Sequence, residues 1–149
     1  MLNSDFTLSQ AMYECRAMRR LKADPVRDEV LIDLIDAANQ AASGSNAQMA
    51  RWIAVKDPAQ KRKLADLNRL HGEPYIAADR ANPRDDKQRR LLDAVIWQMD
   101  HMHEIPALIV ACYDYETRVD GPEIYRKAGS VWPGIQNLLL TARAMGLGA

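Results

Sequence analysis

Apolar side chains recur every three or four residues in five segments of this chain, and this spacing predicts five helices. The first should begin after Thr7, because Thr7 and Gln10 match the capping-box pattern. It should end near Met18 and give way to a more extended segment. A longer helix would place Arg19 in the middle of the apolar stripe, and Pro25 disfavours helix in the residue before it. The apolar faces expected to be buried are, in chain order, Leu8, Ala11, Met12, Cys15 and Met18; Leu31, Leu34, Ile35, Ala38 and Ala42; Leu64, Leu67 and Leu70; Leu92, Val95, Ile96 and Met99; Ile135, Leu138, Leu139, Ala142 and Met145.

The second and third helices have recognisable boundaries. The second is expected over residues 28–41. The third should begin at Pro58, with Asp57 as its cap, and end at Gly72. The strongly charged stretch 73–90 predicts an exposed excursion, either a mobile flap or a plain surface loop, and we favour the loop.

Two apolar segments have the character of strands. Residues 52–55 predict a short buried strand, and residues 107–113, with the sequence ALIVACY, predict a central strand covered on both faces. A polar loop through Gly121 should follow, and the last helix should end at Gly146. We therefore expect a single helix-rich α+β domain over residues 1–149, with helices packed around a small central sheet. Two strands alone make a poor sheet, so we expect a further strand from another chain or from sequence missing at the C-terminus.

The composition is that of an ordinary globular protein. Of 149 residues, 48% are apolar and 27% are charged, and 20 basic residues balance 20 acidic ones. A net charge of zero argues against a chain built for non-specific binding to nucleic acid or membranes. We expect no membrane span, no secretory signal and a cytoplasmic location. Cys15 and Cys112 fit no zinc or redox spacing and are expected to be unpaired thiols in a reducing compartment.

Three arginines, Arg16, Arg19 and Arg20, lie where the first helix meets the extended segment. The planar guanidinium group donates paired hydrogen bonds and keeps its charge, which suits a phosphate ligand. Taken alone, the cluster is more typical of a solvated basic helix end, where cations also favour the helix dipole.

A second candidate site is the polar loop 43–48, which carries two hydroxyls and two side-chain amides in a Gly-containing turn. Such a loop offers donors and acceptors to the polar edge of a heterocycle. Serine, glycine and asparagine are also the standard turn residues, so this loop taken alone favours an ordinary turn.

The histidines do not predict a metal site. His101 and His103 are two residues apart, and on a helix such neighbours point in nearly opposite directions. No HExxH, GxSxG, GxxxxGK or GxGxxG pattern is present, so acyl-transfer, P-loop and Rossmann functions have no support.

Taken in order, these segments resemble the nitroreductase family. The stretch 16–48, RAMRRLKADPVRDEVLIDLIDAANQAASGSNAQ, is similar to the opening of that family: Arg-Arg-Ser-x-Arg, an extended segment, Pro-Val, a helix, and Ala-Pro-Ser-x-x-Asn-x-Gln-Pro-Trp. The later IPALIVACYD is similar to the family's central strand, and GSVWPGIQNLLLTARAMGLGA resembles its long helix ending in Gly-Leu-Gly. The resemblance covers nearly the whole chain.

The resemblance implies a homodimeric α+β fold with flavin mononucleotide (FMN) bound at the subunit interface. By motif position, Arg16 and Arg19 would hold the FMN phosphate, with Ala17 and Met18 along the same segment and Arg20 a weaker candidate. The loop would approach the ribityl chain and flavin ring from the partner subunit, and position alone assigns a residue of the last helix to the substrate pocket. The loop residues are Ser43, Asn46 and Gln48, and the pocket residue is Trp132.

The implied reaction passes electrons from NADH or NADPH through FMN to a small-molecule oxidant such as a nitroaromatic or quinone. Because the flavin carries the chemistry, no catalytic side chain is expected. The alternative is a non-catalytic flavin-binding or dimeric interaction protein on the same scaffold. Other flavin reactions, such as dehalogenation and dehydrogenation, also occur on this fold and are not separated by the sequence.

The sequence departs from the family pattern at several positions. Cys15 stands at the first arginine position and Ala17 at the serine position, so the phosphate site has fewer side-chain donors. Ala42 replaces a proline, and Met49 and Ala50 replace Pro-Trp beside the flavin. The family continues well past Gly-Leu-Gly, and the missing part motivates the non-catalytic alternative.

Overall fold

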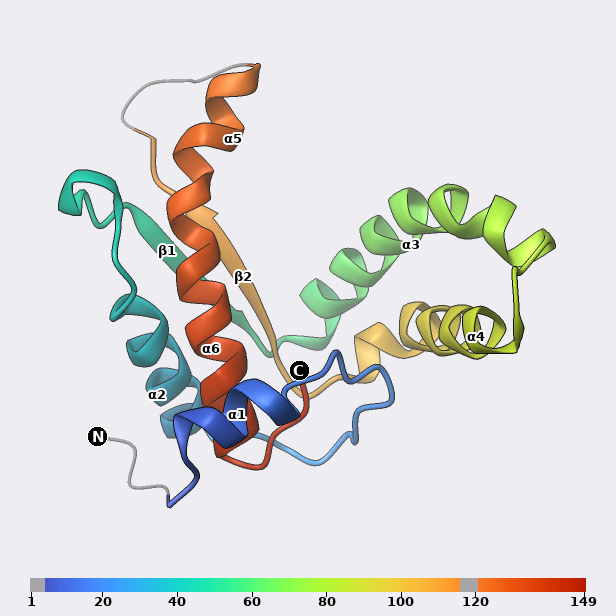
Figure 1. Cartoon of the computed structure of the whole chain (residues 1–149), viewed down its shortest axis with the longest axis horizontal. Helices are drawn as coiled ribbons and strands as arrows, with labels where there is room; N and C mark the ends of the chain where they lie inside the picture. The colour runs from blue at the N-terminus through green and yellow to red at the C-terminus, as the bar shows by residue number, and fades with distance from the viewer. Residues whose placement is uncertain (1–4, 116–120) are drawn as a thin grey trace. The chain divides into compact units, whose positions relative to one another are not determined.

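The computed structural model describes residues 5–115 and 121–149 (Figure 1). Residues 1–4 of the N-terminal stretch and 116–120 of the expected polar loop lie outside the described residues. The elements, in chain order, are helices α1 (Leu8–Glu14) and α2 (Asp28–Asn39), the 3-10 turn η1 (Gly44–Asn46), strand β1 (Ala50–Val55), helices α3 (Pro58–Ala81) and α4 (Asp86–His101), the turn η2 (Met102–Glu104), strand β2 (Leu108–Tyr113), helix α5 (Pro122–Ala128), the turn η3 (Gly129–Val131) and helix α6 (Trp132–Ala144).

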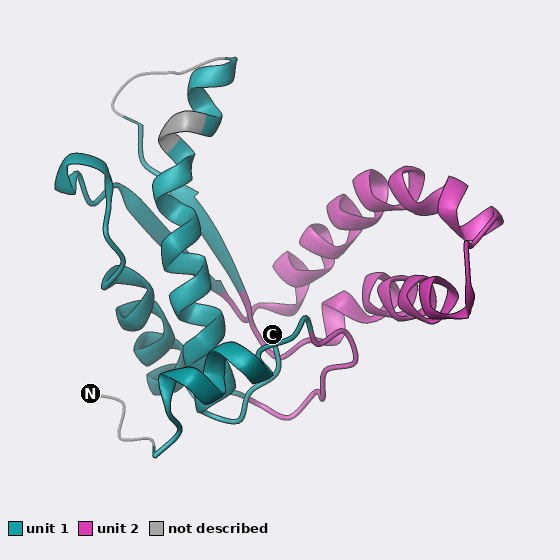
Figure 2. Cartoon of the chain, viewed as in Figure 1, with its two compact units in different colours: residues 1–17, 26–54, 109–149 teal, residues 18–25, 55–108 magenta. Residues whose placement is uncertain are grey.

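The chain divides into two compact units (Figure 2). Unit 1 comprises residues 1–17, 26–54 and 109–149, and therefore holds α1, α2, most of both strands, α5 and α6. Unit 2 comprises residues 18–25 and 55–108, and holds the extended segment together with α3 and α4.

In unit 1, α2 and α1 both pack against α6. The buried side chains come from all three helices and from the turn before α6, and Ala38 and Ala142 are the most deeply buried at 2% exposed. Small residues at these positions let helix backbones approach closely. The other buried apolar side chains of this unit are Ala11, Leu31, Leu34, Val131 and Leu138.

The sheet of unit 1 pairs β1 with β2. The Asp114 N–H, just after β2, donates to the Met49 carbonyl, just before β1, at 2.8 Å. The start of one strand therefore lies beside the end of the other, and the pair is antiparallel (Figure 1). The prediction of two strands is confirmed, but their burial is not as predicted: β2 is half-buried throughout, and much of β1 is exposed.

Several predicted helix ends are confirmed with their hydrogen bonds. Thr7 and Gln10 form the full capping box of α1, and the Asp57 side chain accepts the Gln60 N–H at 2.8 Å ahead of Pro58. At the end of α6, Gly146 has φ 76°. Its N–H and that of the next residue bond back to carbonyls near the helix end, at 3.0 and 2.8 Å, which is the Schellman arrangement.

In unit 2, α3 runs without interruption to Ala81, so the predicted stop at Gly72 is wrong. The charged excursion predicted over residues 73–90 is also wrong, because only four residues separate α3 from α4. Pro74 lies inside α3. Packing along α4 outweighs these local breaking signals: the space beside Gly72 is filled by Met99 of α4, whose Cε lies 3.4 Å from where a Cβ would stand.

Some predicted apolar faces are wrong as well. Leu67 and Leu70 of α3 are 54% and 65% exposed, and α3 instead buries Lys61 and Ala65. The first helix ends at Glu14 rather than near Met18, and its stripe is largely exposed in this chain. The periodic spacing of apolar residues identifies an amphipathic helix, but it does not show which other element packs against the apolar face. The other expected core positions found exposed are Leu8, Met12, Met18 and Ala42.

Candidate functional site

The polar loop after α2 has a strained backbone. Ser45, Asn46 and Gln48 have φ values of 53°, 54° and 52°, a left-handed region that costs a non-glycine residue about 1–2 kcal/mol. Strain of this kind persists only where surrounding contacts hold it, and it gathers at ligand-binding sites. The turn-like composition of the loop did not reveal it.

Hydrogen bonds hold the loop in this shape. The Ser43 Oγ accepts the Gln48 N–H at 3.0 Å, closing the loop across its base. The Gly44 N–H donates to the Ser130 Oγ at 3.3 Å, which ties the loop to the turn before α6. The Gln48 side-chain amide donates to the Asn46 Oδ1 at 3.2 Å. The loop is therefore ordered by its own polar groups while most of it stays exposed.

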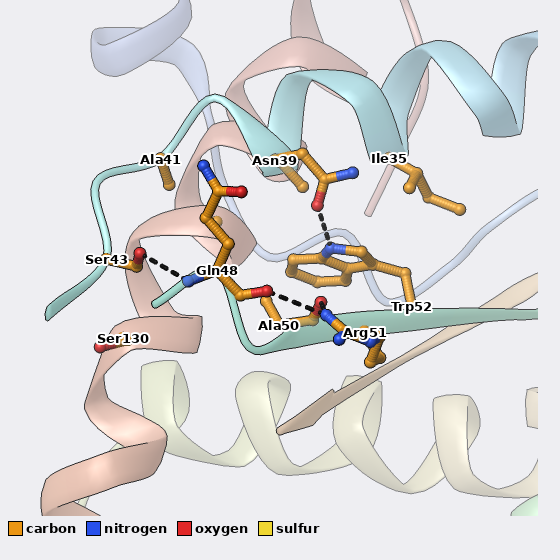
Figure 3. Close-up of a pocket in the computed structure, with 11 residues that line it drawn as sticks. Ile35, Asn39, Ala41, Ser43, Gln48, Ala50, Arg51, Trp52 and Ser130 are labelled. Atoms are coloured by element: carbon orange, nitrogen blue, oxygen red, sulfur yellow. Dashed lines mark hydrogen bonds between the residues drawn. The ribbon is translucent and has the colours of Figure 1, made fainter. Parts of the chain in front are cut away.

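A pocket of about 500 Å³ opens beside this loop, entirely within unit 1 (Figure 3). On one side, the Trp52 Nε1–H donates to the Asn39 Oδ1 at 2.9 Å, which fixes the indole against α2. On the other side lie the loop and the start of α6. The polar and aromatic lining residues are Asn39, Ser43, Gln48, Arg51, Trp52 and Ser130.

Arg51 brings a positive charge to the pocket. Its guanidinium donates to the carbonyls of Gln48 and Ala50, at 2.9 Å each, and pairs with the Asp114 carboxylate at 3.1 Å. Both charged side chains are about half exposed, at 54% and 51%, so the pair is a modest contribution to stability. Its main effect is to hold the loop end against the strand pair.

Arg16 lies at another part of unit 1. Helix α1 ends in extended backbone at Cys15, whose thiol lies 3.9 Å from the Leu139 carbonyl of α6. The Arg16 guanidinium donates to the Cys15 carbonyl at 2.6 Å, and the side chain is exposed. Leu139 and Ser130 are nine residues apart, roughly 13 Å along a helix. Within one subunit, Arg16 and the polar loop therefore do not meet.

The boundary between the two units falls within the arginine segment. Ala17 closes a unit 1 segment, while Met18 and Arg19 begin a unit 2 segment. Arg20, the weaker candidate for the phosphate site, places its guanidinium carbon 5.3 Å from the centre of the Trp97 ring of α4. That contact occupies Arg20 in a cation–π interaction.

Trp132, assigned from position to the substrate pocket, is the first residue of α6 and is 67% exposed. The pocket beside the loop is lined by Ser130 and Gly134 on either side of it in sequence, but not by Trp132 itself. Of the predicted site residues, the structure thus brings together Ser43, Asn46 and Gln48. Sequence reasoning missed Asn39, Arg51, Trp52 and Ser130, because they sit on a helix, a strand and a turn that carried no motif.

A second pocket, of about 480 Å³, lies between α3 and α4 in unit 2. Its rim carries the Arg69–Asp100 ion pair. The hydrogen bond from Arg69 is the main cause that lowers the pKa of Asp100, and the same bond raises the pKa of Arg69. Apolar side chains of Ile76, Ile96 and Met99 complete the lining.

Within residues 5–115 and 121–149, no group of three or more His, Cys, Asp or Glu side chains is arranged to hold a metal ion. His101 instead stacks on Trp97, with ring centres 4.1 Å apart, and its Nδ1 lies 2.8 Å from the Trp97 carbonyl. Over the same residues, no helix combines the length and the apolar character needed to cross a bilayer.

Comparison with known proteins gives a consistent result. The sequence model of the nitroreductase family matches residues 14–149. An NADH dehydrogenase of Thermus thermophilus is 41% identical over 51 residues, which is 34% of this chain and 25% of that protein. An FMN reductase [NAD(P)H] of Bacillus subtilis is 31% identical over 67 residues, which is 45% of this chain and 26% of that protein. The matched segments thus span about a quarter of each curated relative.

Among solved structures, the fold is similar to that of an oxidized iodotyrosine deiodinase bound to FMN and 3-iodo-L-tyrosine. The TM-score is 0.72 at 24% sequence identity, over 95% of this chain and 72% of that one. This likeness confirms the predicted helix-rich α+β fold.

Proposed function

Because the chain belongs to the nitroreductase family, we propose that it is an FMN-dependent oxidoreductase that takes electrons from NADH or NADPH. The observation that carries the proposal is the match of the family over residues 14–149, which includes both the arginine segment and the strained polar loop. The names of the two curated relatives, an NADH dehydrogenase and an FMN reductase, support the same class of reaction.

The residues present fit a flavin nucleotide. FMN carries a phosphate dianion, which calls for cationic donors, and a flavin ring with donors and acceptors along one edge. Arg16 is exposed beside extended backbone, and Arg19 follows three residues later. The loop offers the amides of Asn46 and Gln48 on a pre-shaped backbone. The donor set thus matches both ends of the cofactor.

FMN, when bound, supplies the redox chemistry, and the protein supplies binding and orientation. Arg16 and Arg19 would neutralise the phosphate, with Ala17 and Met18 along the same segment. Ser43, Asn46 and Gln48 would hold the ribityl chain and ring edge. The strained loop is an advantage here, because its polar groups are already ordered and little conformational entropy is lost on binding. Trp132, exposed at the start of α6, would contact the electron acceptor.

The protein is proposed to act as a homodimer, with each flavin bound by two subunits. Arg16 and the loop are separated within one subunit, so a single flavin contacting both would need the loop of a second copy. Exposed apolar side chains on α1 and α2 also favour a covered surface. These are Leu8, Met12, Tyr13 and Ile32. Sedimentation at several protein concentrations, with and without FMN, tests the dimer; a monomer under all conditions would refute it.

The first test is direct. Purified protein is mixed with FMN, passed through a desalting column and scanned for the flavin absorbance bands, and NADPH or NADH is then added without oxygen. Bands that stay with the protein and bleach support the proposal, and addition of a nitroaromatic or quinone should restore them. Protein that retains no flavin at any concentration tested would refute it.

The residue assignments have their own test. Arg16→Ala or Arg19→Ala should weaken FMN binding by about 1.5–3 kcal/mol, as for a lost charge-assisted hydrogen bond. Riboflavin, which lacks the phosphate, should bind these variants as it binds the wild type. Arg62→Ala, an exposed arginine on α3, is the control for a change of net charge. Unchanged FMN affinity in both variants would show that the phosphate site is elsewhere.

The alternative, a non-catalytic flavin-binding or interaction protein, predicts a different outcome in the first test. Flavin would be retained, but its bands would not bleach with either nicotinamide donor. A chemical reductant such as dithionite separates the cases, since it reduces any accessible bound flavin. Bleaching by dithionite but not by NADH or NADPH would therefore favour the alternative or a different electron donor.

A further inference from the structure

Within unit 2, an aromatic pair on α4, Trp97 and His101, contacts the segment that carries Arg19. The guanidinium carbon of Arg20 lies 5.3 Å from the centre of the Trp97 ring, within the range of a cation–π interaction. Residues 18–25 group with α3 and α4 rather than with the helix that precedes them.

The Trp97 ring is itself fixed. His101, one turn further along α4, stacks on it with an interplanar angle of 11° and ring centres 4.1 Å apart. The His101 Nδ1 lies 2.8 Å from the Trp97 carbonyl, which sets the rotation of the imidazole. Both rings are half-buried. Trp97 therefore presents a ring of defined orientation to the arginine segment.

The residues after α1 are not helical as far as α2. A contact between Arg20 and Trp97 therefore limits how far the neighbouring Arg19 can move. The described residues 15–27 belong to no helix or strand.

We propose that Trp97 is a positioning residue for the flavin phosphate site: by holding Arg20, it sets the path of the segment from Met18 to Pro25 and so the placement of Arg19. The inference rests on the proposed function. It assigns Arg20 a role distinct from that of its neighbours, an anchor on the protein rather than a ligand of the phosphate.

The experiment compares the dissociation constants of FMN and riboflavin for wild type, Trp97→Leu, Trp97→Phe, Arg20→Ala and the Trp97→Leu/Arg20→Ala pair. Trp97→Leu should reduce the preference for FMN over riboflavin by about two- to fivefold, as expected for one lost cation–π contact of an exposed arginine. Riboflavin affinity should not change, whereas a loss of general packing would weaken both flavins equally. Trp97→Phe keeps an aromatic face and should retain most of the preference.

The double variant separates an anchor from a ligand. If Arg20 acts through Trp97, then Arg20→Ala has no further effect on the preference in the Trp97→Leu background. An equal effect in both backgrounds would show that Arg20 binds the phosphate itself and would overturn the proposal. Arg90→Ala, an exposed arginine on α4, is the matched control for loss of one positive charge and should behave as wild type.

A flavin-free measurement tests the anchor independently. Trypsin cleaves after Arg19, Arg20 or Lys22, and cleavage there should be faster in Trp97→Leu than in wild type or Trp97→Phe, as followed by mass spectrometry. Equal rates would overturn the anchoring contact. Wild-type protein that binds neither flavin would instead refute the proposed function, and the positioning role with it. This outcome is distinguished from the others because it needs only the wild-type protein.

Discussion

Gly134 is the position where a single added methyl group should matter most. It lies in the first turn of α6, where that helix crosses α2 and the indole of Trp52. A Cβ at this position would stand 2.9 Å from the Trp52 Cζ2 and 3.0 Å from the Ala38 carbonyl oxygen. The indole is held by its bond to Asn39, and the carbonyl belongs to the backbone of α2. Moving either group away from an added methyl group would therefore cost free energy.

The size of the effect follows from two opposing terms. Alanine in place of glycine inside a helix gains roughly 0.5–1 kcal/mol. Overpacking a core position costs typically about 1–3 kcal/mol, and two close contacts with held groups place Gly134→Ala at the upper end of that range. The expected net loss in the free energy of unfolding is therefore about 1–2 kcal/mol.

Urea unfolding followed by far-UV circular dichroism measures this loss as a lower midpoint at unchanged slope. Gly129→Ala is the matched control, since a Cβ added there would meet nothing within 4 Å and its φ is not in the left-handed region; it should be neutral or slightly stabilising. In a Trp52→Phe background, which removes the Cζ2 contact, Gly134→Ala should cost less. A Gly134→Ala protein as stable as wild type would refute the packing argument.

Three further predictions concern stability. Thr7→Ala removes the capping box of α1 and should cost about 1 kcal/mol in urea unfolding, whereas Thr7→Ser should cost little. Lys61→Met leaves the Ile105 carbonyl without the donor now 2.6 Å away and should cost about 1–3 kcal/mol; wild-type stability would show that water replaces the ammonium group. The hydrogen bond from Arg69 lowers the pKa of Asp100 in the folded protein. The stabilisation that the Asp100 carboxylate adds to the folded state is therefore present at pH values above its ordinary pKa of 3.8, and it is lost as the pH falls through the lower folded pKa. In Asp100→Asn, the free energy of unfolding should therefore fall less steeply as the pH is lowered through this range. An unchanged pH dependence would contradict the stabilising role of Asp100.

The helix starts and stops predicted from single residues are largely confirmed where side chains or backbone φ decide them locally. The capping box at Thr7, the Asp57 cap before Pro58 and the glycine stop at Gly146 are of this kind. The stop at Gly72 is wrong because a glycine costs a helix interior only about 1 kcal/mol. Contacts along α4 outweigh that amount, and no local pattern around Gly72 records them.

In the candidate site, too, some features could be predicted from the sequence and others depend on the tertiary structure. Residue types alone identified Ser43, Asn46 and Gln48 as polar groups in one loop, and the structure places them together. Their left-handed backbone, and the wall made by Trp52 and Asn39, could not be predicted. One of the hydrogen bonds that tie this loop to the rest of unit 1 comes from Gly44 to Ser130, which is more than 80 residues away in the chain.

By itself, the amino-acid sequence determined the helix-rich α+β class, the capped helix ends, the two strands and the family, because these depend on residues within a few positions of one another or on motifs in chain order. Only the tertiary structure decided that α3 continues through Pro74, that Trp52 closes a pocket and that Arg20 lies on Trp97. Each of these depends on side chains brought together from distant segments, and their contact free energies are comparable to the local preferences they override.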